Sequence, residues 1–579
     1  MSNLNSTSKI YTDPSYQAVH DETYAHPLDP EIPRVLPPGV NQQQFDDALR
    51  KCEQVLGSSS SVYTGKDLKE FVDPYDLPEE GYEKKIPSAA IRVGSVEDLR
   101  AVLRIANASK IPLWVVSRGK NLGYGGPAPV VPGSVVLDLH RINKVIEVNE
   151  KLAYAVVEPG VTFADLYKYC ADRQLKVWPS TASLGWGSVI GNTLDRGMGF
   201  VPMGMHHHHI AGLEVVLANG DIVRTGQFSS TKSPSAHLTT LTFGPTIDGL
   251  FLQSNLGIVT KMGIHMQRQP EAYMSCRLDM PELDDLATIV DLLGELRRNG
   301  TLSTFTYVYP ILMEASLYKQ RHEWHANMSE PIPEWRLREI MQELNCGWWI
   351  ARFSFMGPKQ VIEAHYKEVV RVVSARAPTG RLSQTTFTGG EKEGGLVNAA
   401  SVPMPHGGQF VGVPDIEGVA VTRVMNSQAK ANAPGAHAAY SPILPLDGKV
   451  VLEWFRCAKG IYEKHGVDIL EDFYFNDRCT VSVCEFPWEK TDAAQRQKVA
   501  AISAGLFEAG KQRGLTKYRS HINHMDKGAD LFDFNDHAYR RFVETLKDSL
   551  DPNGILSPGK QGIWPRHLRH LSHREPSRI

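Results

Sequence analysis

The sequence predicts an α+β fold in which a middle domain is inserted into a discontinuous outer domain. Short helical and β-rich segments alternate over the first half of the 579 residues, and longer amphipathic stretches follow. Near its end the chain returns to Gly and Pro turns. We therefore expect an N-terminal arm over 1–40, an outer domain over 41–272 and 506–579, and an inserted domain over 273–505.

Residues 95–116 predict a helix followed by a buried strand. Ser95 stands where an N-cap belongs, with Asp98 three residues later. Apolar side chains then keep helical spacing at Leu99, Val102, Leu103 and Ala106. The apolar run Leu113–Val116 predicts the strand. These residues supply one helix and one strand of the α+β outer domain.

Two further patterns predict a hairpin and loops. Apolar runs flank Asn219–Gly220, which is the strongest short signal of a β-hairpin. Residues 284–300 carry the periodicity of an amphipathic helix in the inserted domain. The Gly- and Pro-rich stretch 388–414 interrupts such patterns, so we expect loops there.

The composition is that of an ordinary soluble protein, with 42% hydrophobic and 22% charged residues. The formal net charge of -3 gives no general field for nucleic acid, so no nucleic-acid partner is expected. The chain contains no apolar run of roughly 18 residues, so we expect no membrane span.

Cysteine usage and the two termini bear on the cellular compartment. The seven cysteines are odd in number and form no C-x-x-C pair, which is typical of a reducing compartment rather than of disulfide or zinc frameworks. The N-terminus lacks the pattern of a secretory signal. The last residues, Ser577-Arg578-Ile579, keep the small, basic, aliphatic order of a peroxisomal address. We expect an intracellular protein, either peroxisomal or cytoplasmic.

Four consecutive histidines, His206–His209, raise the question of a metal site. In an extended run, alternation would put His206 and His208 on one side and His207 and His209 on the other. Zinc needs three or four converging ligands, so we expect no metal site.

A glycine-dense loop, Ser117–Pro129, follows the strand predicted at Leu113–Val116. Its glycines allow positive φ and let several backbone N–H groups converge on one anion, as in loops that hold a pyrophosphate. The loop is not a G-x-G-x-x-G turn that opens a helix, which argues against a Rossmann domain. A second glycine-dense segment follows at Ser183–Gly199.

The order of these segments resembles the FAD domain of the vanillyl-alcohol oxidase and para-cresol methylhydroxylase family. The resemblance extends from about Asp73 to Trp564, and the loop "GKNLGYGG" is similar to that of the 4-phenol-oxidising branch. It implies a two-subdomain FAD-binding fold of the vanillyl-alcohol oxidase type plus an α+β cap domain with an antiparallel sheet. It also implies that FAD is bound by Ser117, Gly119, Lys120, Asn121, Leu122, Gly123, Pro159, Ser183, Gly185, Ser188, Gly191, Asn192, Ile258 and Lys560.

His437 stands in "GAHAAYSP", where the resemblance implies a histidine linked covalently to the 8α-methyl group of FAD. That reaction needs a neutral imidazole as nucleophile. A histidine that only packs in the core is the alternative interpretation. The segment "STASLGWG" contains no cysteine for a second link, so we expect a single bond.

Three further residues would bind a phenolic oxygen. The resemblance implies that Tyr124, Tyr518 and Arg519 hold the substrate as a phenolate, since arginine stays charged and tyrosine hydroxyls donate to an oxyanion. Adjacent strand residues point to opposite faces, so Tyr518 and Arg519 can serve one site only if the chain bends there.

The sequence departs from the family pattern at two places. Met205 stands where relatives carry an aspartate near the reacting end of the flavin, and methionine neither takes nor gives a proton. Tyr75 stands where vanillyl-alcohol oxidase has a histidine that assists flavin attachment. We therefore include Met205 among the catalytic positions, as a site whose changed chemistry bears on both flavin attachment and substrate.

The loss of this carboxylate leaves open which group accepts a proton. Tyr124, Tyr518 and a nearby histidine are the candidates. Ala438 and Ala439 are small where vanillyl-alcohol oxidase, to which the sequence is similar, has bulkier residues. We therefore expect room for a larger, less polar alcohol.

We expect an FAD-dependent oxidase that transfers hydride from the para side chain of a 4-substituted phenol, or from an alcohol carbon, to FAD, with oxygen then giving hydrogen peroxide. The alternatives are an oxidase of bulkier aliphatic or secondary alcohols, a cytochrome-linked 4-alkylphenol dehydrogenase, and a catalytically silent flavin-binding protein. The resemblance also implies a homodimer or larger homo-oligomer.

Overall fold

The computed structural model describes residues 34–58, 61–78, 85–391, 394–403, 408–415 and 435–573. The C-terminal Ser577–Ile579 and most of the predicted N-terminal arm lie outside the described residues.

A four-stranded sheet opens the fold in the order β1-β2-β4-β3, with parallel pairing of β4 to both β2 and β3. Its strands are β1 (Val62–Tyr63), β2 (Ala89–Arg92), β3 (Leu113–Val116) and β4 (Val135–Asp138). Helices α3 (Gln42–Leu56) and α4 (Val96–Ser109) share one apolar core with it. The predicted helix and strand are confirmed, and Ser95 Oγ accepts the N–H of Asp98 as the expected N-cap.

A five-stranded antiparallel sheet follows, ordered β5-β6-β10-β8-β9. Its strands are β5 (Val145–Asn149), β6 (Tyr154–Val157), β8 (Ile210–Val216), β9 (Ile222–Arg224) and β10 (Ile258–His265). The predicted hairpin is confirmed, because β8 and β9 pair antiparallel across Asn219–Gly220. Helices α5 (Phe163–Asp172) and α6 (Val189–Leu194) lie beside it, and β7 (Val177–Trp178) pairs with β11 (Gln267–Arg268).

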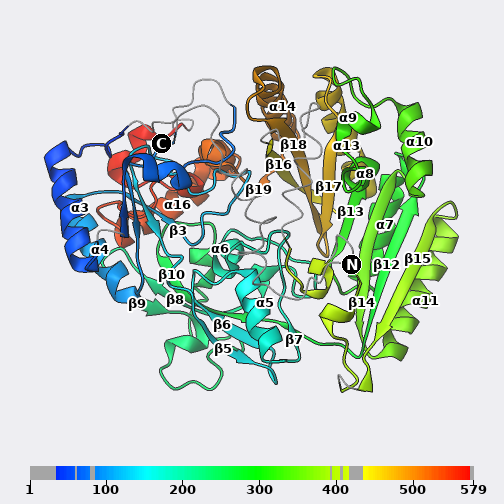
Figure 1. Ribbon diagram of the computed structural model, residues 1–579, viewed down its shortest axis with the longest axis horizontal. Coiled ribbons are helices and arrows are strands. Elements are labelled where there is room, and N and C mark those ends of the chain that lie inside the picture. Colours follow the sequence, from blue (N-terminus) through cyan, green and yellow to red (C-terminus); the bar gives the residue numbers. More distant parts are fainter. Residues whose placement is uncertain are drawn as a thin grey trace.

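An eight-stranded antiparallel sheet forms the other half of the molecule, at the right of Figure 1. Its order is β15-β12-β14-β13-β17-β18-β16-β19. The strands are β12 (Ala272–Met280), β13 (Thr306–Pro310), β14 (Trp349–Gly357), β15 (Arg381–Thr388), β16 (Gly435–Pro445), β17 (Leu470–Phe475), β18 (Cys479–Glu489) and β19 (Lys517–Arg519). The expected α+β fold with an antiparallel sheet in its second part is confirmed.

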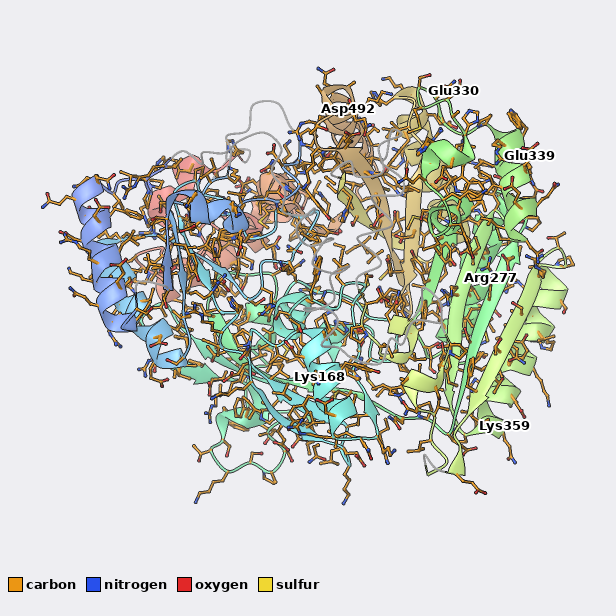
Figure 2. The ribbon with its side chains drawn as sticks, in the orientation of Figure 1. Lys168, Arg277, Glu330, Glu339, Lys359 and Asp492 are labelled. Carbon is orange, nitrogen blue, oxygen red and sulfur yellow. The ribbon has the colours of Figure 1, made fainter. Side chains whose placement is uncertain are left out.

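Helices cover the outer side of this sheet, among them α7 (Asp285–Arg298), α11 (Lys359–Arg376), α13 (Gly448–Lys464) and α14 (Ala493–Gln512). The shorter helices α8 (Ile311–Ser316), α9 (Arg321–Trp324) and α10 (Glu334–Leu344) follow β13. In Figure 2, Glu339 and Lys359 lie at the periphery, whereas Arg277 lies within the sheet. No helix in the described part of the chain is both long enough and apolar enough to cross a membrane.

Two features bear on the domain boundaries. The predicted boundary between residues 505 and 506 falls inside α14, and β19 beyond it pairs with β16 in the large sheet. The division into arm, outer domain and inserted domain therefore stays a prediction.

The C-terminal helices α15 (Met525–Asp530) and α16 (Phe534–Leu550) return the chain to the first two sheets. Lys547 on α16 is fully buried with Asp551, at 2.7 Å between Nζ and Oδ2. Its ammonium group also donates to the carbonyl oxygens of Asn255 at 2.9 Å and Leu556 at 2.7 Å. This ion pair therefore fastens two loops from distant parts of the sequence.

Replacing Lys547 by methionine should destabilise the protein by about 3–5 kcal/mol, because it leaves the Asp551 carboxylate buried without its partner. Thermal and urea denaturation would measure the loss. Lys168→Met on α5 is the matched control, since its ion pair with Asp172 is exposed and contributes little. Equal melting temperatures for the two variants would contradict the prediction.

Candidate functional site

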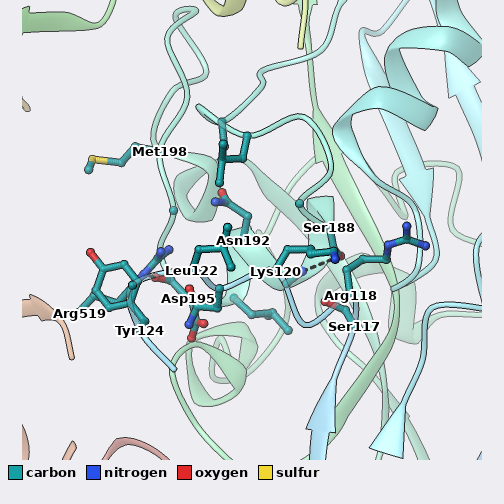
Figure 3. Close-up of a pocket in the computed structure, with 18 of the residues that line it drawn as sticks. Ser117, Arg118, Lys120, Leu122, Tyr124, Ser188, Asn192, Asp195, Met198 and Arg519 are labelled. Carbon is teal, nitrogen blue, oxygen red and sulfur yellow. Dashed lines mark hydrogen bonds between the residues drawn. The ribbon is translucent and has the colours of Figure 1, made fainter. Parts of the chain in front are cut away.

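A cavity of about 470 Å³ lies between the glycine-dense loops and the inner face of the eight-stranded sheet. Most residues predicted to bind cofactor or substrate line it: Ser117, Gly119, Lys120, Asn121, Leu122, Gly123, Tyr124, Pro159, Ser183, Ser188, Gly191, Asn192, Ile258, His437, Tyr518, Arg519 and Lys560. Figure 3 shows Tyr124 and Arg519 at one end and Ser188 with Arg118 at the other. Gly185 and Met205 are not among the lining residues.

The glycine loop follows β3 and turns sharply against the large sheet. Gly119 and Gly123 have φ of 65° and 78°, which L side chains rarely adopt. A Cβ atom on Gly123 would come within 3.0 Å of His437 Nε2. Glycine is thus required where the loop passes the imidazole.

His437 is a half-buried histidine on β16 that lines the cavity. Its Nδ1 is buried without a hydrogen-bond partner in the described chain, and the Tyr75 ring lies 5.0 Å away, edge-on. Burial lowers the pKa of His437 to about 4, although the charge of Asp73 acts in the opposite direction. The ring is therefore neutral near pH 7, the state that a nucleophile needs.

Tyr124, Tyr518 and Arg519 converge, and a bend in β19 explains how. Arg519 pairs with Ser441 and Lys517 with Pro442, so Tyr518 is an extra residue opposite two consecutive residues of β16. Such a bulge changes the direction of the side chains, so Tyr518 and Arg519 can face the same site although they are adjacent in a strand. The Arg519 guanidinium lies 5.1 Å from both tyrosine rings.

The electrostatics of this corner favour an anionic ligand. Arg519 Nε donates to the carbonyl oxygen of Asp195 at 2.9 Å, while Nη2 is buried with no partner among the described residues. Burial raises the pKa of both Tyr124 and Tyr518, so both keep their protons and can donate hydrogen bonds. An oxyanion placed here would meet one permanent cation and two hydroxyl donors.

The histidine run has a structural role at its first member. His206–His208 form a 3-10 turn, so the extended alternation assumed from the sequence is wrong. The turn forms because fully buried His206 bonds on both sides, through Nε2 to Ser180 Oγ at 2.8 Å and Nδ1 to Asn192 Oδ1 at 2.8 Å. His206 thereby fixes Asn192 in the cavity wall. Among the described residues, no group of histidine, cysteine or carboxylate side chains suits a metal ion.

Met205 is half-buried and pairs through a β-bridge with Met198, which does line the cavity. Ala439 lines the cavity as well, whereas buried Ala438 does not. Gly185 donates its N–H to the carbonyl oxygen of Asp415 at 2.6 Å, and Asp415 is a lining residue. These residues support the cavity wall.

The opposite wall carries an acid–tyrosine group, Asp472, Glu485, Tyr307 and Tyr474, that the sequence analysis missed. The hydroxyl groups of Tyr307 and Tyr474 both donate to Asp472 Oδ2, at 2.6 Å and 3.2 Å respectively. Strands β13, β17 and β18 bring these residues together, and all of them line the cavity. Alternation in "LEDFYF" places Asp472 and Tyr474 on one face, but the sequence does not reveal which strand lies beside it.

Burial favours the protonated forms of the two carboxyl groups, Asp472 more strongly than Glu485. It raises the pKa of Asp472 well above its ordinary value, and the neighbouring charge of Glu485 adds to the shift. Burial alone raises the pKa of Glu485 to about 7. Carboxyl groups with such values can exchange protons near neutral pH.

The chain is similar to known flavin-binding proteins. A family model described as FAD binding domain matches residues 87–226. The chain is 29% identical over 534 residues to the 4-cresol dehydrogenase [hydroxylating] flavoprotein subunit of Pseudomonas putida, covering 91% of this chain and 98% of that protein. It is 27% identical over 563 residues to the 1'-carboxy-chondrochloren decarboxylase of Chondromyces crocatus, covering 91% of this chain and 99% of that protein.

Among solved structures, the 4-ethylphenol oxidase of Gulosibacter chungangensis, in its isoeugenol complex, is 33% identical. The match covers 92% of this chain and 100% of that chain, with a TM-score of 0.81.

Glu485 should make the stability of the protein depend on pH. Its pKa is 4.5 in an unfolded chain and about 7 in the fold, so the folded state holds an extra proton between these values. That stabilisation is complete below the lower value and is lost as the pH rises through the higher one. Glu485→Gln removes it, so the melting temperature of the wild type relative to the variant should fall between about pH 5 and pH 8. Exposed Glu339→Gln is the control, and a constant difference across the range would refute the assignment.

Proposed function

Because the chain belongs to the vanillyl-alcohol oxidase and para-cresol methylhydroxylase family of FAD-dependent oxidoreductases, we propose that it oxidises the para side chain of a 4-alkylphenol. The predicted two-subdomain FAD-binding fold with a cap domain is confirmed by the solved relatives. The observation that carries the proposal is the Arg519 Nη2 atom, which lies buried near two tyrosine rings and has no hydrogen-bond partner in the part of the chain that the structure describes.

The cavity fits FAD on features of this chain. The glycine loop has positive φ at Gly119 and Gly123, as loops that hold phosphate groups do, and it carries Lys120, whose pKa burial lowers to about 7. His437 presents a buried nitrogen with no partner in the described chain. The residues proposed to hold FAD are those of the glycine loop together with Ser188, Asn192, Ile258 and Lys560. When bound, FAD supplies the two-electron acceptor for the hydride.

Tyr124, Tyr518 and Arg519, which we call the phenol corner, would make the loss of hydride from the substrate easier. Arg519 and the hydroxyl groups of Tyr124 and Tyr518 would hold the phenolic oxygen as an anion. Negative charge on that oxygen raises the electron density of the ring, which stabilises the para carbon as hydride leaves. Tyr124 also contacts Ser441 Oγ at 3.4 Å, so its hydroxyl has a fixed neighbour.

We propose that Asp472, acting with Glu485, replaces the carboxylate missing at Met205: protonated Asp472 passes its proton to Glu485, which is partly ionised near pH 7, and takes up the proton of the substrate. Asp472 lies in the same cavity, and Tyr307 and Tyr474 hold one of its oxygens. Its Oδ1 is buried with no partner among the described residues, so it is free to bond a substrate or water. The group sits on the eight-stranded sheet rather than on the Met205 turn.

We propose oxygen as the final electron acceptor, giving hydrogen peroxide, in line with the 4-ethylphenol oxidase. A dehydrogenase that passes electrons to a cytochrome is the second candidate, because the similarity to the 4-cresol dehydrogenase flavoprotein subunit extends over 91% of the chain. The speed at which air restores the flavin colour after reduction separates the two.

Anaerobic mixing with a series of 4-alkylphenols should bleach the flavin absorbance. Arg519→Gln should slow bleaching by about 10- to 100-fold, because a charged hydrogen bond to the phenolic oxygen is lost. Asp472→Asn should slow bleaching with little change in phenol binding, which separates the proton acceptor from the oxyanion site. Alcohols of matched length without a phenol ring are the control: fast bleaching by these alone would replace the phenol proposal, and no bleaching by either class would indicate a silent flavoprotein.

We also propose that His437 forms the covalent bond to FAD. Its neutral ring, buried Nδ1 and position beside Gly123 support this role. Acid-precipitated wild-type protein should show flavin fluorescence in its band on a denaturing gel, and His437→Ala should lose it while still binding FAD. His206→Gln is a control, because it changes a buried histidine that does not line the cavity. Fluorescence retained by His437→Ala would place the bond elsewhere, and a dark wild-type band would exclude it.

A further inference from the structure

Arg352 lines the cavity wall and has no role in the proposed oxidation. It lies on β14, is half-buried and lines the same cavity as the phenol corner. Within the described chain its one recorded contact of the charged group is with the Phe410 ring, 4.6 Å from the ring centroid.

Two other partly or fully buried arginines, Arg277 on β12 and Arg321 on α9, have oxygen partners. Arg277 bonds both oxygens of Asp279 and one of Glu314, and buried Arg321 bonds Asp468 at 2.8 Å. Arg352 makes no hydrogen bond or ion pair within the described residues, although burying part of a charged group is costly without a partner. The planar edge of its guanidinium is thus available to a ligand.

Two carboxyl groups of this region, Asp472 on β17 and Glu314 on α8, already have hydrogen-bond partners. Tyr307 stands directly opposite Arg352 in the β13–β14 register, and its hydroxyl bonds Asp472. Tyr309 donates to Glu314 at 2.9 Å, which Arg277 also contacts. Among the described residues, Arg352 thus has Tyr307 opposite it in the sheet and the Phe410 ring against its guanidinium, and no ion pair with a carboxylate.

The strand order places Arg352 far from the phenol corner. Arg519 lies on β19 and Arg352 on β14, with β13, β17, β18 and β16 between them. Five steps of about 4.8 Å separate these strands, or roughly 24 Å between backbones before the two long side chains reach inward. One ligand can meet both only if a chain of several atoms leaves its ring.

We propose that Arg352 binds a carboxylate at the far end of the substrate's para side chain, so that the substrate class is 4-hydroxyphenyl alkanoic acids. This inference rests on the proposed phenol oxidation. A carboxylate matches the guanidinium edge with two parallel hydrogen bonds, and the Phe410 ring would cover the face of the pair. The intervening wall, with Phe200, Tyr307 and Phe410, suits an alkyl chain.

The experiment compares 4-hydroxyphenyl alkanoates of increasing chain length with their methyl esters. Dissociation constants come from perturbation of the flavin spectrum and from ligand-induced shifts in melting temperature, and rates come from anaerobic bleaching. One chain length of the free acid should bind at least about tenfold more tightly than its ester. Arg352→Met should abolish that preference by weakening the acid alone, and Arg352→Lys should restore part of it.

Exposed Arg381→Met is the matched control, since it removes one positive charge from the same sheet outside the cavity. Equal binding of acid and ester by the wild type at every length would overturn the inference. So would an Arg352→Met variant that weakens both ligands equally, because that result assigns Arg352 to the packing of Phe410. The binding assays report on Arg352 even if no phenol bleaches the flavin, so failure of the proposed oxidation is seen separately.

Discussion

The pairing of β19 with β16 is the constraint on which the site depends. β16 carries His437, Ala439 and Ser441 at alternate positions, and β19 adds Tyr518 and Arg519 at the edge of the same sheet. The extra residue in β19 turns both side chains toward one cavity. This ladder joins the C-terminal segment directly to the strand that carries His437, and the bond from Arg519 Nε to the carbonyl oxygen of Asp195 holds the segment from the other side.

Burial decides the charge of almost every group around that ladder. It raises the pKa of the tyrosines and of Asp472 and Glu485, and it lowers the pKa of His437 and His206. Arginine resists this effect because its ordinary pKa is so high. The cavity is therefore a largely neutral, hydrogen-bonding enclosure in which the Arg519 guanidinium, whose pKa is raised, keeps its positive charge.

The sequence predicted the parts of the site that lie within single segments. The glycine loop, His437 and the Tyr518-Arg519 pair each belong to a short continuous motif, and the structure brings them to one cavity. Asp472, Tyr307 and Arg352 could not be found in this way, because strands far apart in the sequence bring them together. The 3-10 turn at His206 also escaped prediction, since it depends on tertiary bonds to Ser180 and Asn192.

The bonds of His206 explain why the neighbouring position 205 can hold a methionine. The turn that carries Met205 is held by His206, whose two bonds do not require a carboxylate next to it. Asp472 lies on the facing sheet and is held there by two tyrosine hydroxyls. The turn is thus stable whether or not residue 205 is acidic. The Asp472 carboxyl group remains in the cavity, on β17. Strand β13, which carries Tyr307, lies between β17 and the strand of Arg352, β14. One sheet would therefore provide both the group that exchanges the proton and the group that selects the length of the substrate.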